Sequence, residues 1–149
     1  MNKADFQFIK RENEVLIKKP GDINGIDFQI KDCKNCTIIL MDHTAQIQIW
    51  RCENTTFYIG PIKASIFVHE SKKCSFTIAC AQFRCRGLYD SQLYMYTPND
   101  PIIESSGRLT FAPYNFQYNL LYEHSLAADL IGDFMDEEGN RQTKINKWS

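Results

Sequence analysis

The chain has 149 residues, of which 44% are hydrophobic and 23% are charged. This length suits one domain with a hydrophobic core, and the composition excludes a disordered, collagen-like or coiled-coil protein. Seventeen basic and eighteen acidic residues give a net charge of −1, which argues against binding of nucleic acid through clustered Lys and Arg. No apolar run approaches the roughly 18 residues of a membrane span.

The N-terminal segment, residues 1–20, alternates weakly between apolar and polar residues and ends in the turn signal Pro20-Gly21. It is expected to form one or two short strands. Residues 1–5 match neither a signal peptide nor a myristoylation site, so neither secretion nor a membrane anchor is expected. The predicted location is the cytoplasm.

An internal repeat begins near Gly25 and defines the main domain, residues 21–134. Apolar–any–apolar triplets recur in two series, at residues 28–30, 47–49, 66–68 and 83–85, and at residues 38–40, 57–59, 76–78, 93–95 and 109–111. Each triplet places two apolar side chains on one face of a strand. Because the offsets of both series shorten together from 19 to 17 residues, both series are assigned to the same coils.

The predicted fold is therefore all-β, a parallel β-helix of about five coils whose stacked turns share one core. An antiparallel β-sandwich is the alternative, since strands about ten residues apart suit that class as well. The sandwich is less favoured because it gives no reason for two series to keep register.

Six cysteines fit this repeat as small corner residues. Cys33 and Cys52 fall in one column, and Cys36 and Cys74 in another, with Thr55 between them. The pair Cys33-x-x-Cys36 has zinc spacing, but no second pair follows at a suitable distance, so no metal site is predicted. Free cysteine packs as a small hydrophobe, which is the preferred interpretation of all six.

The C-terminal part changes character. Residues 114–122 are rich in aromatics, and Ala127, Leu130, Ile131 and Phe134 have helical spacing after Ser125, a suitable N-cap. A short helix packed on the solenoid is predicted here, followed by an exposed tail at residues 135–149.

One outer face carries the candidate binding residues. If the triplet at 83–85 points inward, Gln82, Arg84 and Arg86 point outward together. The same offsets align Arg84 with Phe67, Gln48 and Gln29, and Arg86 with His69, Trp50 and Lys31. Exposed aromatics beside arginine are typical of a binding hot spot, although solvated charges and a stabilising aromatic ladder are equally consistent with the pattern.

Other arrangements of polar residues do not form a recognisable active site. The three histidines lack metal spacing, and no nucleophile elbow or nucleotide-binding glycine loop occurs. Asp42, His43 and Thr44 are predicted to serve a turn, and Glu104 by itself suggests a turn acceptor. No stand-alone hydrolase is predicted.

Four blocks of sequence resemble one known family in order and spacing. They are residues 32–36 (DCKNC), 60–67 (GPIKASIF), 79–86 (ACAQFRCR) and 101–106 (PIIESS). Together they resemble the cofactor C-like domain family, whose members include tubulin-folding cofactor C and the retinitis pigmentosa 2 protein, the latter being the more similar. The resemblance covers roughly residues 20–134 and implies a right-handed parallel β-helix.

The resemblance also implies activation of a GTPase. The residue matching Arg84 is the family's arginine finger, supported by the glutamine matching Gln82. The residue matching Glu104 lies beside that site, and aromatics matching the segment around Phe134 help to hold the partner. Arg86, Phe67, His69 and Trp50 are the further candidate partner-binding residues. The implied partner is an Arf-like small GTPase or tubulin, and GTP and magnesium belong to that partner, so no cofactor is expected in this chain.

Two other functions stay open. The additional domains and the acylated N-terminus of the family members are not recognisable here, which favours a non-catalytic β-helix module in a microtubule- or cilium-associated assembly. An actin-associated relative is less favoured, because such domains lack the Gln-x-Arg block.

Overall fold

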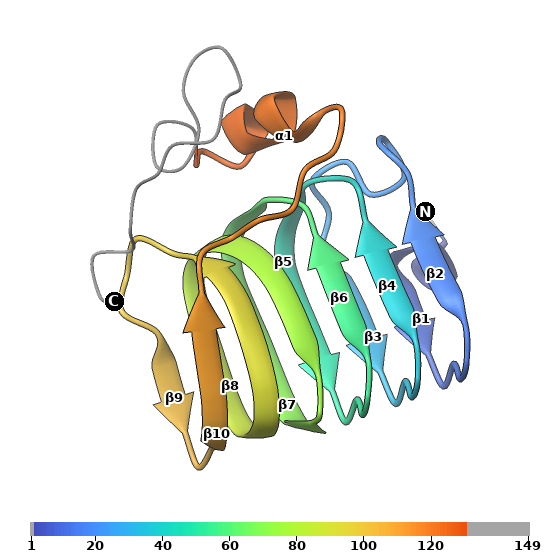
Figure 1. The fold of residues 1–149 in the computed structure, drawn as a ribbon. Coiled ribbons are helices and arrows are strands. Elements are labelled where there is room, and N and C mark those ends of the chain that lie inside the picture. The colour runs from blue at the N-terminus through green and yellow to red at the C-terminus, as the bar shows by residue number, and fades with distance from the viewer. Residues whose placement is uncertain (1, 131–149) are drawn as a thin grey trace.

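The structure, a computed structural model that describes residues 2–130, consists mainly of short parallel strands wound into a solenoid (Figure 1). In chain order the strands are β1 (Gln7–Ile9), β2 (Val15–Lys18), β3 (Phe28–Lys31), β4 (Thr37–Leu40), β5 (Thr44–Trp50), β6 (Thr56–Ile59), β7 (Ile62–Lys72), β8 (Ser75–Tyr96), β9 (Ile102–Glu104) and β10 (Gly107–Ala112). A 3-10 helix, Lys3–Phe6, precedes them, and one α-helix, α1 (Leu121–Ala127), follows them.

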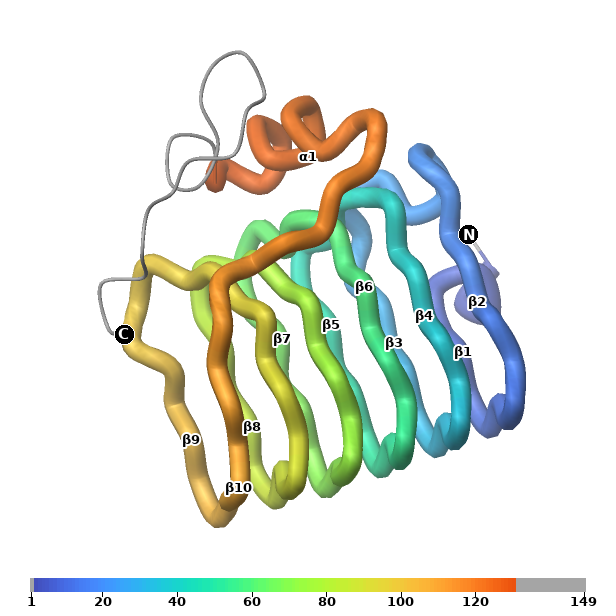
Figure 2. The backbone as a smooth tube through the Cα atoms, in the orientation of Figure 1, coloured from blue at the N-terminus to red at the C-terminus, as the bar shows by residue number. Residues whose placement is uncertain are grey.

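Each turn of the solenoid supplies strand segments to two columns (Figure 2). The first column runs β1, β3, β5, β7, the middle of β8, and β9, while the second runs β2, β4, β6, two further parts of β8, and β10. The predicted parallel β-helix is confirmed, with about six turns instead of five. The extra turn arises because β1 and β2 pair with β3 and β4, so residues 7–18 supply both strands of a first turn.

The predicted register is confirmed through the central turns. Phe28 pairs with Ile47, which pairs with Ile66, which pairs with Phe83, and all four side chains are buried. The prediction is wrong by two residues in the last turn, where Leu93 pairs with Phe111 and not with Leu109. A shift of two keeps the same face inward, so the apolar pattern alone does not distinguish the two registers.

The corners repeat one backbone arrangement. Two residues per corner adopt the left-handed conformation, as Asp32 and Asn35 do in one turn and Arg51 and Asn54 in the next. Small side chains between and after them bond to the carbonyl oxygen two residues earlier. These side chains are Cys33, Cys36, Cys52, Thr55, Ser71, Cys74, Ser91 and Ser106.

The cysteines are packing residues, as predicted. All six are free and buried, and burial raises the pKa of the Cys74 thiol to about 11 and that of Cys80 to about 12. Within residues 2–130, no three His, Cys, Asp or Glu side chains gather into a group that could hold a metal ion.

The segment after β10 returns along the upper edge of the solenoid and ends in α1 (Figure 1). The Tyr114 hydroxyl donates to the carbonyl of Ile59, which ties this segment to β6. A short C-terminal helix exists as predicted, but its predicted position is wrong. The helix spans Leu121–Ala127, so Ser125 lies inside it and donates to the carbonyl of Leu121, and Leu130 lies beyond its end. No side chain caps its start; burial of Leu121 and Ser125 accompanies its placement on the solenoid.

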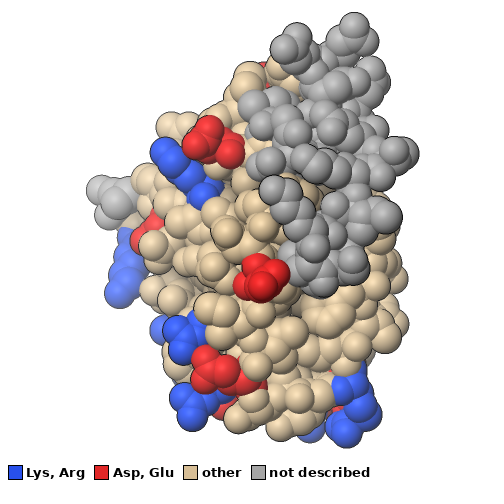
Figure 3. All heavy atoms as spheres, turned by 90° about the vertical axis from the view of Figure 1, so that its left-hand side faces the viewer, with Lys and Arg blue, Asp and Glu red and all other residues tan. Residues whose placement is uncertain are grey.

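The turn that contains β9 and β10 is the last of the described turns, and among the residues that the structure describes it pairs with a neighbouring turn on one side only. Ile103 and Phe111 are consequently 43% and 39% exposed, although their partners Cys85 and Leu93 are buried. Figure 3 views this end, where charged side chains lie mostly toward the rim. In the described part of the chain, no helix has the length and apolar character needed to cross a membrane.

Candidate functional site

The outer face of the first column carries the residues that the repeat aligned. Arg84 pairs with Phe67 and Arg86 pairs with His69, as predicted, and one turn earlier Phe67 pairs with Gln48 and His69 with Trp50. The burial alternates along the middle of β8, where Phe83 and Cys85 are buried and Arg84 and Arg86 are exposed. The strand period therefore places both arginines on the solvent side of a rigid ladder.

Aromatic rings on this face form a continuous stack. The ring of Trp50 lies 3.6 Å from that of His69 with an angle of 2° between them, and the ring of Phe67 lies 3.7 Å from His69 at 13°. The Arg84 guanidinium carbon lies 4.6 Å from the centre of the Phe67 ring, which is a cation–π contact. Four planar groups, Trp50, His69, Phe67 and Arg84, thus lie against one another.

Glu104, from β9, holds the other side of this arginine. Its Oε1 atom accepts from Arg84 Nη2 at 3.0 Å and from Nε at 3.3 Å. Glu104 stands opposite Arg86 in the strand register, so its bond to Arg84 crosses diagonally between neighbouring residue pairs. The residue pattern by itself suggested a turn acceptor at Glu104, whereas the family resemblance placed Glu104 beside Arg84, which is where the structure has it.

Gln82 and Arg86 complete the polar part of the face. Gln82 donates through Nε2 to the carbonyls of Phe83 and Asp100, which fixes its side chain and leaves its Oε1 without a hydrogen-bond donor among the described residues. Arg86 is exposed and forms no ion pair with any described residue. The site therefore presents Arg84, which is held by Glu104, Arg86, which has no ion-pair partner among the described residues, and the oriented amide oxygen of Gln82.

His69 is the one titratable ring inside the stack. Its Nε2 atom lies 2.9 Å from Gln48 Oε1, a contact that the sequence did not predict. Burial lowers the pKa of His69 below its ordinary value, and the nearby positive charges of Arg84 and Arg86 lower it further, against an opposing effect of Glu70. The neutral ring is therefore favoured within the stack.

Of two other predicted features, one lies outside the described residues and the other lies elsewhere on the solenoid. Phe134 lies outside the described residues, so its predicted role in partner binding stays a prediction. Asp42 is buried and serves a turn, as predicted: it accepts from the backbone N–H groups of Gly21, Ile23 and Asn24. It also lies 3.3 Å from His124 of α1, a contact between distant segments that no local pattern signals.

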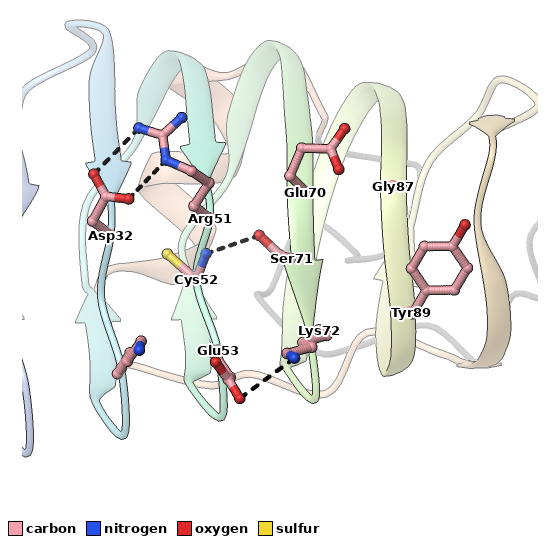
Figure 4. Close-up of a pocket in the computed structure, with 10 residues that line it drawn as sticks. Asp32, Arg51, Cys52, Glu53, Glu70, Ser71, Lys72, Gly87 and Tyr89 are labelled. Atoms are coloured by element: carbon pink, nitrogen blue, oxygen red, sulfur yellow. Dashed lines mark hydrogen bonds and ion pairs between the residues drawn. The ribbon is translucent and has the colours of Figure 1, made fainter.

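A separate hollow of about 400 Å³ lies along one corner of the solenoid (Figure 4). Its charges largely pair with one another, because Arg51 bonds to Asp32 at 2.8 Å and Lys72 lies 3.9 Å from Glu53. Gly87 lines the hollow, and the carboxylate of Glu70 from the preceding turn fills the space that a side chain at Gly87 would need. The face around Arg84 is the better candidate site, because it combines stacked aromatic rings with Arg86, which has no ion-pair partner among the described residues.

The fold and this face together define a class of protein: a parallel β-helix that presents an arginine and a glutamine from one strand, backed by aromatic rings. A comparison with family models finds the tubulin binding cofactor C family over residues 25–136. The chain belongs to this family.

Similar proteins found by sequence comparison support this assignment. Protein XRP2 of Danio rerio is 36% identical over 126 residues, which are 85% of this chain and 34% of that protein. Protein XRP2 of Homo sapiens is 35% identical over 76% of this chain, and tubulin-specific chaperone C of Bos taurus is 22% identical over 95% of it. The chain spans between a third and two fifths of the length of these relatives.

Proposed function

We propose that this protein stimulates GTP hydrolysis by a partner GTPase, into whose nucleotide site it inserts Arg84. The observation that carries the proposal is the placement of Arg84 and Gln82 two residues apart on the exposed face of β8, with Glu104 and Phe67 against the guanidinium. The family assignment and the resemblance of the block around Arg84 to the arginine finger of that family support it.

The chemistry of GTP hydrolysis explains why an arginine suits this position. Transfer of the γ-phosphoryl group to water spreads negative charge over the phosphate oxygens. A guanidinium supplied in trans stabilises this charge in the transition state and raises the rate of hydrolysis by roughly 10³–10⁵-fold. Arginine stays charged and offers a planar set of N–H donors, whereas lysine offers a point charge. The Glu104 contact occupies Nε and Nη2, so Nη1 of Arg84 has no acceptor among the described residues and is available to phosphate oxygens.

Gln82 has a supporting role in this proposal. Its amide nitrogen bonds to two backbone carbonyls, so the side chain is oriented before any partner binds. The remaining amide oxygen accepts from the attacking water or from the arginine. Trp50, His69, Phe67, Arg86 and Glu104 then form the surrounding contact surface.

The proposed partner is an Arf-like small GTPase or tubulin, and the partner holds GTP and magnesium. The name of tubulin-specific chaperone C motivates tubulin, and the resemblance to the family motivates the small GTPase. Both partners are compatible with the proposed location in the cytoplasm, at the cytoskeleton or at a cilium.

A non-catalytic binding module in a microtubule- or cilium-associated assembly is the second candidate. It is favoured by one observation: Arg84 lies against Glu104 and Phe67 on the protein's own surface, as an arginine with a purely structural role would. Such a module binds its partner without changing the rate of GTP hydrolysis.

Single-turnover GTP hydrolysis distinguishes the two candidates. GTP-loaded Arf-like GTPases and tubulin are each mixed with the wild-type chain, with Arg84→Ala and with Arg86→Ala, the matched change at the other outward arginine of β8. Acceleration of about a hundredfold or more that Arg84→Ala abolishes is expected. Stimulation that survives Arg84→Ala unchanged contradicts the finger, and binding without acceleration favours the non-catalytic module.

A further inference from the structure

We infer that Phe67 is a positioning residue for Arg84, and that Trp50 and His69 form the rigid base that holds Phe67 in place. This inference rests on the proposed function, because positioning matters only if Arg84 enters a partner's nucleotide site.

Arg84 is held from two sides that differ in chemistry. Glu104 Oε1 accepts from Nε and Nη2, and the guanidinium carbon lies over the Phe67 ring, 4.6 Å from its centre. The carboxylate alone fixes one edge and leaves the guanidinium free to tilt about that edge. The ring removes this freedom, so both contacts are needed to aim Nη1 away from the surface.

The Phe67 ring is itself supported from behind. His69 stacks on it at 3.7 Å, and Trp50 stacks on the opposite side of His69 at 3.6 Å. The bond between His69 Nε2 and Gln48 Oε1 prevents the imidazole from turning out of the stack. Since Trp50, Phe67 and His69 project from β5 and β7, whose strands are paired through six residues, the base is as rigid as the ladder beneath it.

Pre-orientation matters because an arginine side chain has many rotamers in water. Unless the side chain is ordered beforehand, the entropy lost on ordering it adds to the activation free energy. A cation–π contact is worth more once a partner excludes water from it. Loss of the Phe67 ring is therefore expected to lower the maximal stimulated rate by roughly five- to thirtyfold while Arg84 stays present.

The register of the solenoid supplies a suitable substitution. Gln48 and Gln29 occupy the positions aligned with Phe67 in the two preceding turns, so Phe67→Gln places a residue that this column already accepts. Phe67→Tyr keeps the ring and tests rescue. Tyr58→Leu, which removes an exposed aromatic side chain from β6 in the other column, is the matched control.

The experiment measures the stimulated rate of single-turnover GTP hydrolysis against the concentration of each full-length variant. Phe67→Gln is expected to lower the rate at saturation five- to thirtyfold, Phe67→Tyr to restore it to within about twofold, and Tyr58→Leu to leave it unchanged. NMR gives a second readout without any partner: the ring current of Phe67 displaces the Arg84 side-chain resonances in the wild type, and Phe67→Gln removes this displacement.

Failure of the inference is distinguishable from failure of the proposed function. If Arg84→Ala abolishes stimulation and Phe67→Gln leaves the saturating rate unchanged, Arg84 acts without Phe67 and the inference is overturned. A change only in the concentration for half-maximal stimulation also overturns it, because Phe67 then contributes binding and not orientation. If Arg84→Ala has no effect, the proposed function itself fails. Should Phe67→Gln unfold, Phe67→Leu replaces it in every comparison.

Discussion

At the scale of single residues, Glu104 is predicted to matter for activity and not for stability. The Arg84 and Glu104 side chains are 45% and 40% exposed, and exposed ion pairs contribute little to folding. Glu104→Gln is therefore expected to change the free energy of unfolding by less than about 0.5 kcal/mol while it lowers the stimulated hydrolysis rate. Urea denaturation and single-turnover hydrolysis on the same preparation check both parts. A large loss of stability contradicts this separation.

His69 makes the stability of the protein dependent on pH. Its pKa in the folded protein is lowered, chiefly by burial, from the ordinary value of 6.5, so the folded state binds the proton less readily than the unfolded state. Its unfavourable effect is absent above pH 6.5 and grows as the pH falls below that value. The free energy of unfolding, measured by urea denaturation between pH 7.5 and 5.5, is expected to decline, and less steeply in His69→Gln. Equal slopes contradict the expectation.

The contacts around Arg84 also show what residue patterns do and do not predict. The alignment of Arg84 with Phe67 and Gln48 followed from the repeat, because strand period and coil length determine which backbone positions are adjacent. The bond from Glu104 to Arg84 did not follow, because the register places Glu104 opposite Arg86 and the side chain reaches across. Which of two neighbouring residues a side chain bonds to depends on the local packing of side chains, and the repeat pattern does not contain that information.

At the scale of the element, Gly60 marks the place where the segment before α1 crosses the solenoid. A Cβ atom at this position would overlap the carbonyl oxygen of Asp42 and lie 2.5 Å from the Tyr118 hydroxyl. Tyr118 in turn lies 2.7 Å from Nδ1 of His124, so the contact reaches α1.

Gly60→Ala is accordingly expected to destabilise the protein by about 1–3 kcal/mol, the usual range for an overpacked site. It is also expected to loosen α1 from the solenoid. Thermal unfolding and amide exchange of residues 121–127 measure the two effects. Gly107→Ala is the matched control, because a Cβ atom there meets only the Tyr89 ring at an ordinary 3.6 Å. Equal effects of the two substitutions contradict the steric explanation.

The position of α1 was the least predictable element. Ser125 has the composition of an N-cap, yet it lies within the helix and bonds to the carbonyl of Leu121. The start of this helix coincides with the burial of Leu121 and with the contacts of His124 to Tyr118 and Asp42. The contact with Asp42 is a tertiary contact with a turn about eighty residues away, and local capping rules do not contain it.

At the scale of the whole molecule, the solenoid is expected to lose structure from its ends. Each turn contacts only its neighbours, so the terminal turns are stabilised from one side and the central turns from two. Hydrogen exchange is predicted to be fastest in β1, β2, β9 and β10 and slowest in β5 and β7. Exchange followed by mass spectrometry checks this order; uniform protection across all turns contradicts it.

The overall architecture was largely predictable because a solenoid repeats one local solution. The corner positions filled by Cys33 and Cys52 were identified from offsets alone, since the same backbone turn recurs in each coil. The number of turns and the register of β10 were less predictable, because the N-terminal strands are short and the last repeat changes length. A repeat defines its interior better than its ends.

The placement of Arg84 on a strand within the ladder has a consequence for competition among partners. At this residue β8 pairs with β7 on one side and with β9 on the other, so the backbone that carries the arginine is fixed in the sheet and does not move to suit different partners. If Arg84 acts as proposed, each chain offers a single such arginine on one face, so any two partners that require it exclude each other. Under the proposed function, the partner that is bound then depends on relative abundance and affinity, so an excess of one partner would compete the protein away from the other.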